Sequence, residues 1–247
     1  MGSVTIGHLG TRLFAGMLLL AALGAAPAQA MSMEEDGCRN DRTPAIAIVY
    51  CTRLIQSAQH AGAELAWAYA NRGWAYGEEG KDDLAMADFE TALRLKPDED
   101  LAFYRRGNLY LAVGKPEQAF ADYSAAMRVK PEDPEYLNSA CWALIALRRG
   151  QEALADCDKS LKLRPEDAFT LDSRGYAHLL LNNPAAAIAD FDRALKLEPK
   201  LATSLFGRAR AREQGGDKAG AARDYAAARA VEGDIEAILT QERILPM

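Results

Sequence analysis

The stretch Asn71–Pro97, NRGWAYGEEGKDDLAMADFETALRLKP, holds two amphipathic segments separated by a glycine-bearing turn and closed by a proline. Its first segment carries a central glycine, Gly73, and its second carries Ala85 and Phe89 four residues apart. The same order returns in Asp172–Pro199, DSRGYAHLLLNNPAAAIADFDRALKLEP. Ala, Leu, Glu, Lys and Arg dominate both stretches, and no alternating β-branched run competes. Both segments are therefore predicted to be helices.

Four columns of residues repeat every 34 residues along the chain. The small-residue column is Gly73, Gly107, Cys141, Gly175 and Ala209, and the alanine column is Ala85, Ala119, Ala153, Ala187 and Ala221. The aromatic column is Phe89, Tyr123, Cys157, Phe191 and Tyr225, and the units close at Pro97, Pro131, Pro165, Pro199 and Gly233. Several columns in one period indicate a single unit stacked on copies of itself. We therefore expect an all-α fold of five helical hairpins, at 66–99, 100–133, 134–167, 168–201 and 202–235.

The glycines of the small-residue column lie in mid-helix, where glycine costs about 1 kcal/mol relative to alanine. Such a cost, repeated in phase, is best explained by close approach of the two helices in each hairpin. Large residues of the aromatic column then fill the space beside the small ones. A glycine- or asparagine-bearing turn separates the two helices of each unit: Gly80, Gly114, Gly150, Asn182-Asn183-Pro184 and Gly215-Gly216.

The first thirty residues form a candidate export leader. Arg12 precedes a short apolar run, LFAGMLLLAALG at 13–24, and Ala28-Gln29-Ala30 provides a small-x-small motif. This pattern is typical of a secretory signal peptide, here 1–30 with cleavage after Ala30. The run is shorter than the roughly 20 residues that span a bilayer, so we expect no membrane insertion after cleavage. An uncleaved membrane anchor is the alternative.

Charge and cysteine usage agree with export. The formal net charge is −6, without a strongly basic stripe, which argues against nucleic acid and anionic lipid as partners. The four cysteines separate into two near pairs, Cys38 with Cys51 and Cys141 with Cys157. In an oxidising compartment they are expected to pair in this way, with buried free thiols as the alternative.

The segments that flank the repeats carry different signals. Residues 31–42 are polar without a period and are expected to be loosely ordered. Thr43-Pro44 marks a helix start, and the helix from Pro44 to about Ser57 matches the second helix of a repeat, so 31–65 is read as a polar segment and a capping half-repeat. At the other end, 236–247 is read as a capping helix and tail. Its apolar residues Ile238 and Leu239, together with Ile235, would cover the end of the stack.

Over residues 63–235 the chain resembles the tetratricopeptide repeat family, in the order small, aromatic, alanine, aromatic, alanine, proline. With the leader, it resembles an exported member of alphaproteobacterial type. The resemblance implies a right-handed α–α superhelix, a solenoid of helical hairpins whose concave groove is lined by the first helices and receives a peptide or partner helix. The third unit departs from the family at Cys141 and Cys157, and the fifth has Ala209 and Arg212 in place of glycine and tyrosine.

If the first helices line a groove, side chains beside the small-residue column are the candidates for partner contact. Tryptophan and tyrosine are frequent anchors because they bring a large area with a polar tip. The predicted groove residues are Asn71, Trp74, Tyr104, Arg105, Asn108, Asn138, Trp142 and Tyr176. The alternative for Trp74 and Trp142 is packing between neighbouring repeats. Asn71 and Arg105 match two positions of the clamp with which some relatives hold a carboxylate terminus, but the other positions do not match, so no such clamp is predicted.

Further columns have a structural explanation. Asp88, Asp122, Asp156, Asp190 and Asp224 recur in phase with Arg72, Arg106, Arg174 and Arg208, which predicts Arg–Asp pairs of the exposed kind that contribute about 1 kcal/mol or less. Aspartates one repeat apart do not cluster around a metal ion. His178 stands in the column that holds Tyr76 and Tyr110 and is read as a core residue. We expect no catalytic, metal or cofactor site.

The favoured hypothesis is therefore an exported, periplasmic adaptor or assembly factor that binds a protein or peptide in its concave groove. The alternative is a structural subunit that self-assembles through its outer helix faces or its ends. An enzyme would need a convergent polar pocket that the sequence does not reveal. The oligomeric state is left open.

Overall fold

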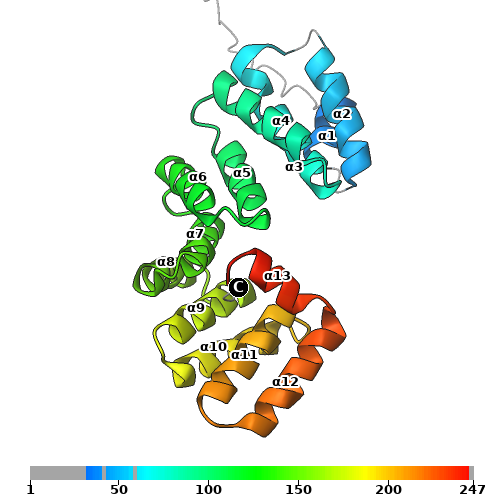
Figure 1. The fold of residues 1–247 in the computed structure, drawn as a ribbon. Coiled ribbons are helices and arrows are strands. Elements are labelled where there is room, and N and C mark those ends of the chain that lie inside the picture. The colour runs from blue at the N-terminus through cyan, green and yellow to red at the C-terminus, as the bar shows by residue number, and fades with distance from the viewer. Residues whose placement is uncertain (1–31, 41–42, 58–59, 245–247) are drawn as a thin grey trace, which may run out of the picture. The chain divides into compact units, whose positions relative to one another are not determined.

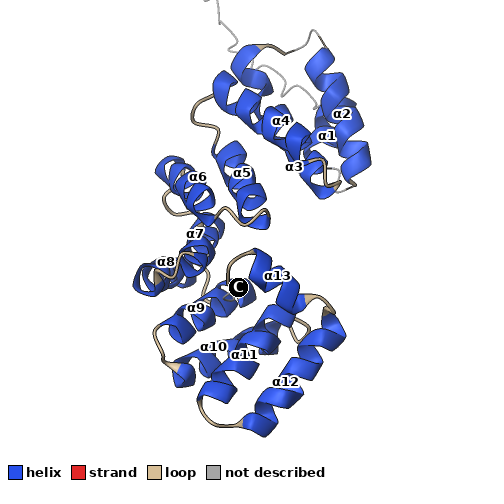
Figure 2. Ribbon diagram, viewed as in Figure 1, coloured by secondary structure: helices blue, strands red, loops and turns tan. Residues whose placement is uncertain are grey.

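The computed structural model describes residues 32–40, 43–57 and 60–244, and within these ranges the chain is helical without a strand (Figures 1 and 2). The predicted signal peptide and its cleavage site lie outside the described residues. A 3₁₀ turn, Gly62–Leu65, precedes five hairpins. These are α3 (Ala66–Glu78) with α4 (Asp82–Leu95), α5 (Asp100–Ala112) with α6 (Pro116–Val129), α7 (Pro134–Ala146) with α8 (Gly150–Leu163), α9 (Ala168–Leu180) with α10 (Pro184–Leu197), and α11 (Ala202–Gln214) with α12 (Lys218–Val231).

The hairpins stack in chain order. Each second helix contacts the first helix of the next hairpin, from α4 with α5 to α10 with α11, and successive first helices also touch. The fold is the all-α solenoid that the 34-residue spacing predicts. None of the helices in the described ranges is long and apolar enough to span a bilayer.

The mid-helix glycines allow the two helices of a hairpin to meet over an aromatic ring, as predicted. A Cβ atom on Gly107 would lie 2.6 Å from the ring of Tyr123, and one on Gly175 would lie 2.6 Å from the ring of Phe191. Gly207 of the next hairpin lies against the opposite side of Phe191. Because there is no room for a methyl group at these positions, glycine is required despite its cost in helix propensity.

In the third hairpin, a disulfide joins the two helices at the repeat positions that correspond to the glycine and the ring. Cys141 and Cys157 form a disulfide, with Cα atoms 5.5 Å apart, and both residues are fully buried. This bond occupies the place of the glycine–ring contact in the other hairpins. The predicted pairing is therefore present in the structure.

The other four hairpins share an ion pair that the third lacks. An arginine of the first helix donates two hydrogen bonds of 2.7–2.8 Å to an aspartate of the second: Arg72 to Asp88, Arg106 to Asp122, Arg174 to Asp190 and Arg208 to Asp224. The predicted pairing is confirmed, but the expectation that the pairs are exposed is wrong, because the aspartate side chains are only 6–9 % exposed. In the third hairpin Ala140 replaces the arginine, and Asp156 pairs with Lys159.

The turn inside each hairpin places one residue in the left-handed region, again every 34 residues. The residues and their φ angles are Gly80 (68°), Gly114 (70°), Arg148 (63°), Asn182 (55°) and Gly216 (87°). The expectation of Gly150 as the turn residue of the third hairpin is wrong, since Gly150 is the first residue of α8. Arg148 takes this conformation although its Cβ makes it costly.

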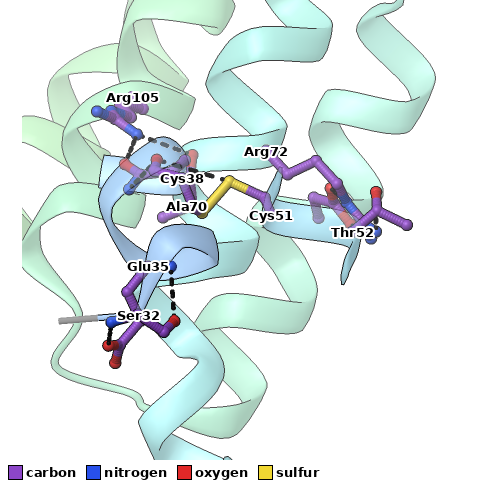
Figure 3. Close-up of a disulfide and its surroundings, with 10 residues drawn as sticks. Ser32, Glu35, Cys38, Cys51, Thr52, Ala70, Arg72 and Arg105 are labelled. Atoms are coloured by element: carbon purple, nitrogen blue, oxygen red, sulfur yellow. Dashed lines mark hydrogen bonds and ion pairs between the residues drawn. A yellow bond between two sulfur atoms is a disulfide. The ribbon is translucent and has the colours of Figure 1, made fainter. Parts of the chain in front are cut away.

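The polar segment before the repeats is helical, so the expectation of loose order is wrong for Met33–Asn40, which forms α1. Its start is fixed by a capping box: the Ser32 N–H donates to Glu35 (2.8 Å), and the Glu35 N–H donates to the Ser32 hydroxyl (3.1 Å). The predicted Cys38–Cys51 disulfide then joins α1 to α2 (Pro44–Gln56) (Figure 3). The predicted half-repeat is thus the second helix of a short hairpin.

The chain continues beyond the fifth hairpin as α13 (Ile235–Gln241), drawn in red in Figure 1. Ile235 and Leu239 are buried, as expected of a capping helix, whereas Ile238 is 39 % exposed. After Leu239 the chain runs back to the second hairpin, where the Gln241 side-chain amide donates to the Ala112 carbonyl (2.6 Å). We call Ile235–Ile244 the C-terminal segment.

Candidate functional site

Two pockets adjoin along the first helices. One, of about 370 Å³, is lined by α5, α7 and α9 and includes Asn138 and Trp142. The other, of about 340 Å³, is lined by α3, α4 and α5 and includes Trp74 and Arg105. Because both are lined by Asn108 and Ala112, they form one continuous hollow, which we call the first-helix groove.

Trp142 is the central aromatic residue of the groove. It is partly buried, and its ring meets the ring of Tyr176 edge-on at 5.3 Å. Its indole N–H donates to the Glu242 carboxylate at 2.9 Å. Burial raises the pKa of Glu242, although the hydrogen bond from Trp142 opposes this shift. A residue one hundred positions away therefore already satisfies the polar edge of Trp142.

Tyr104 and Asn108 form the next part of the surface, on α5. The Tyr104 hydroxyl donates to Glu135 at 2.7 Å, and its ring packs 4.9 Å from that of Tyr136. Burial, followed by this hydrogen bond, raises the pKa of Tyr104 to about 12, so the hydroxyl stays protonated. Asn108 is exposed, and its side-chain oxygen accepts a hydrogen bond from the Tyr123 hydroxyl (2.7 Å).

At the α3 end, Arg105 lies against the ring of Trp74, with its guanidinium carbon 5.4 Å from the ring centroid. Arg105 also donates to the Ala70 carbonyl (3.1 Å) and to the Asn71 side-chain oxygen (Figure 3). Burial lowers the pKa of Arg105 to about 10, so it remains a cation at neutral pH. This part of the groove is an aromatic surface beside a half-buried positive charge.

The middle of the larger pocket presents acceptors. The Asn138 Oδ1 is buried and accepts no hydrogen bond from the described residues. The buried Asp172 carboxyl accepts from the Ser204 hydroxyl at 2.6 Å, and burial raises its pKa to about 7. An occupant that donates N–H groups would satisfy this region better than an apolar one.

Two predicted groove residues lie in the interior. Tyr176 is 4 % exposed, and its hydroxyl donates to the Thr203 carbonyl (2.9 Å). Asn71 is 6 % exposed, and its amide donates to the Cys38 carbonyl (3.1 Å) while its oxygen accepts from Arg105. These two side chains position their neighbours, Trp142 and Arg105. The other six predicted residues, namely Trp74, Tyr104, Arg105, Asn108, Asn138 and Trp142, lie along the first helices and are partly or fully exposed.

Sequence reasoning missed the residues that follow the last repeat. Gln241 lines the smaller pocket and Glu242 the larger one, and Ile244 lines a third pocket of about 200 Å³ beside Tyr176 and Arg210. These residues belong to no repeat column, so the 34-residue period carries no information about them. The signal that could have found them is the polar Gln-Glu-Arg run between two apolar residues, Leu239 and Ile244.

His178, which the sequence analysis reads as a core residue, is only partly buried. Its Nε2 lies 3.7 Å from the Asp190 carboxylate, and burial lowers its pKa. Across residues 32–40, 43–57 and 60–244, no group of three His, Cys, Asp or Glu side chains could hold a metal ion.

The family models that match the chain carry the description tetratricopeptide repeat. One matches residues 104–168 and 173–235, and another matches 68–99. The chain belongs to the tetratricopeptide repeat family. None of the curated proteins matches the sequence of this tetratricopeptide repeat protein.

Solved structures resemble it in fold. PilW, described as a widely conserved type IV pilus biogenesis factor, is 20 % identical, with a TM-score of 0.62 over 72 % of this chain and 86 % of that one. The PilF protein of Pseudomonas aeruginosa is 20 % identical, with a TM-score of 0.60 over 72 % of this chain and 81 % of that one. YrrB, a tetratricopeptide repeat protein with an unusual peptide-binding site, is 18 % identical, with a TM-score of 0.56 over 78 % and 97 %. At these identities the likeness establishes the fold alone.

Proposed function

We propose that this protein is an exported adaptor or assembly factor of the bacterial cell envelope that holds a segment of a partner protein in its first-helix groove. One observation carries the proposal: consecutive hairpins bring Trp74, Asn108 and Trp142 into two adjoining pockets with room for side chains. Aromatic side chains with polar edges are frequent anchors for protein partners.

The location in the envelope rests on two further features. The sequence begins with a segment typical of a secretory signal, and four buried cysteines form two disulfides. Disulfides persist in oxidising compartments and are rare in the cytosol. The peptide-binding site named for YrrB and the pilus assembly role named for PilW are compatible with this function.

The groove is tested by replacing its aromatic residues together, Trp74→Ala, Tyr104→Ala and Trp142→Ala. A matched control replaces exposed apolar residues on the second helices: Leu84→Ala, Leu163→Ala and Val231→Ala. Crosslinking in the native envelope followed by mass spectrometry identifies the captured protein, and far-UV circular dichroism checks the fold. We expect the groove variant to lose the partner that the wild type and the control variant capture. Equal capture by a folded groove variant would contradict the proposal.

A second candidate, self-assembly through the outer faces, is favoured by one observation. Val129, Leu163, Leu197 and Val231 stand one repeat apart in the last turns of the second helices, and each is 39–47 % exposed. An apolar column of this kind could pair two copies. Sedimentation at several concentrations tests it: a stable oligomer that Leu163→Ser and Leu197→Ser convert to a monomer would favour this role.

A further inference from the structure

The C-terminal segment is folded into the repeat array rather than trailing from it. Ile235, Leu239 and Ile244 are at most 3 % exposed, and they join the core cluster that also contains Tyr176 and Phe206. This burial anchors the start of the segment to the fifth hairpin. It also fixes the direction in which the following residues leave α13.

The last described residues of the segment make polar contacts with three distant helices, namely α5, α6 and α7. Gln241 donates to the Ala112 carbonyl at the C-terminal end of α5, a group that has no partner within its own helix. The Glu242 carboxylate accepts from the Trp142 indole, and Arg243 pairs with Glu117 at 3.2 Å. A bound peptide makes contacts of the same kinds: a hydrogen bond to a helix-terminal carbonyl, a carboxylate that accepts from an indole N–H, and an ion pair.

Two of these contacts lie at the proposed binding surface. Gln241 lines the smaller pocket of the first-helix groove and Glu242 lines the larger one. Gly114 of the second hairpin also lies close to the segment, because a Cβ atom at Gly114 would lie 2.9 Å from the backbone carbonyl oxygen of Gln241. A partner that fills the groove from Trp74 to Trp142 must therefore meet Gln241 and Glu242.

The two parts of the segment differ in how firmly they are held. Ile235 and Leu239 are buried against the fifth hairpin, whereas Gln241 and Arg243 are exposed, and the Arg243–Glu117 pair has side chains that are 45 % and 60 % exposed. Exposed ion pairs contribute little to stability. The side chains of Gln241, Glu242 and Arg243 can therefore leave these contacts without unfolding α13 or the repeats, whereas Ile244 stays in the core.

We propose that the side chains of Gln241 and Glu242 are built-in occupants of the first-helix groove, held beside it by the Arg243 pair with α6, and that the partner is a protein segment of the same chemistry which displaces them. Such a segment carries an amide donor for the Ala112 carbonyl, a carboxylate for the Trp142 indole and a basic side chain for Glu117. The inference rests on the proposed function of the groove and adds the chemistry of its ligand. The contacts of Gln241, Glu242 and Arg243 supply that chemistry directly.

The test measures binding of a labelled synthetic peptide with the sequence of residues 234–244, DIEAILTQERI, to the full-length protein by fluorescence polarisation. The release variant, Glu242→Ala with Arg243→Ala, keeps the buried Ile235, Leu239 and Ile244. We expect it to bind the peptide roughly tenfold more tightly than the wild type, because an internal occupant lowers the fraction of competent groove. Adding Trp142→Phe to the release variant should remove this gain, since the ring stays and only the indole donor is lost. A peptide with both charged residues replaced by alanine should bind less tightly.

Equal affinity of the wild type and the release variant, or a gain that survives Trp142→Phe, would overturn the inference. Circular dichroism checks helicity, and if the double variant loses it, the single Arg243→Ala takes its place. Dimerisation of the release variant in sedimentation would also overturn it, by identifying the occupant as a second copy. Loss of partner capture by the groove variant together with equal peptide affinities would refute this inference alone and leave the proposed function intact.

Discussion

The third hairpin, α7–α8, is closed differently from the other four. The first, second and fourth combine an Arg–Asp pair with a glycine against a ring, and the fifth shares the Arg–Asp pair. In α7–α8, Ala140 takes the place of the arginine and the Cys141–Cys157 disulfide takes the place of the ring contact. It also places Arg148 in a left-handed turn that glycine occupies in three other hairpins. The same hairpin carries Asn138 and Trp142, which lie at the middle of the groove.

This difference shows that hairpin closure has two exchangeable solutions, one covalent and one non-covalent. Ala140 and Arg148 both depart from the residues that support the other hairpins. The disulfide compensates for them and holds α7, with Trp142, against α8. Disulfide formation is therefore part of how the groove is built.

The largest effect on stability is expected from removing the Cys141–Cys157 disulfide. Cys141→Ala with Cys157→Ala should lower the free energy of unfolding by about 3 kcal/mol, the value for a bridge closing a loop of this length. Urea unfolding of the full chain measures it. Installing the other solution in the same hairpin, with Ala140→Arg, Cys141→Gly and Cys157→Phe, should restore a substantial part of the loss. A triple variant no more stable than the alanine pair would show that the two solutions are not exchangeable.

Asp172 of α9 occupies the repeat position that Asn138 occupies in α7. Because only Asp172 titrates, we expect this position of α9 to make stability depend on pH. Below about pH 4 the carboxyl is protonated in both folded and unfolded chains and costs nothing. As the pH rises to 7, the unfolded chain releases the proton while the buried Asp172, whose pKa is raised to about 7, retains it, so stability falls. Asp172→Asn should remove this fall and gain about 3 kcal/mol more at pH 8 than at pH 4. Ser204→Ala, which keeps the carboxyl, should retain the pH dependence, and a retained slope in Asp172→Asn would contradict this assignment.

A smaller loss of stability is expected from breaking the Arg–Asp pair in a neighbouring hairpin. Arg106→Ala leaves the Asp122 carboxylate buried without its two donors and should cost about 2 kcal/mol. The exposed Arg128 on α6 provides the control, because Arg128→Ala should change the free energy of unfolding by less than about 0.5 kcal/mol. Similar losses for the two variants in thermal or urea unfolding would mean that the Arg–Asp column contributes no more than surface charge.

The smallest effect is a gain at the turn of the third hairpin. Arg148→Gly relieves a left-handed conformation that costs a side chain roughly 1–2 kcal/mol, less the entropy that glycine brings to the unfolded chain. We expect a net gain of about 0.5 kcal/mol. Asn182→Gly should gain less, since asparagine tolerates this region. A destabilised Arg148→Gly would show that the arginine side chain makes up for its backbone strain.

The sequence was sufficient for the repeats because every hairpin solves the same packing problem at the same spacing. Five hairpins, the glycine–ring contacts and the cysteine pairs all follow from columns such as Gly107 with Tyr123. The depth of the Arg–Asp pairs did not follow, since a column of charges does not reveal how much the neighbouring helices cover it. The helix α1 was missed because the Ser32–Glu35 capping box was read as part of a polar stretch.

The site was harder to predict, because the surface that faces a partner is the part that does not repeat. Trp74 and Trp142 were found as large residues beside the small column, but Tyr176 in the same column as the two tryptophans and Asn71, three residues before Trp74, proved to be buried. The contribution of residues 241–244 to the site depends on the direction in which the chain leaves α13. That direction is set by the burial of Ile235 and Leu239, which no column encodes.

The most direct test of this account is the indole N–H resonance of Trp142 in a ¹⁵N-labelled full-length chain. The chain has three tryptophans, so the spectrum shows three indole signals, and Trp142→Phe identifies the one that disappears. The account predicts that Glu242→Ala shifts the Trp142 signal alone and speeds its exchange with water, because Glu242 accepts that hydrogen bond. An unchanged Trp142 signal in a folded Glu242→Ala variant would contradict the presence of the C-terminal segment in the groove.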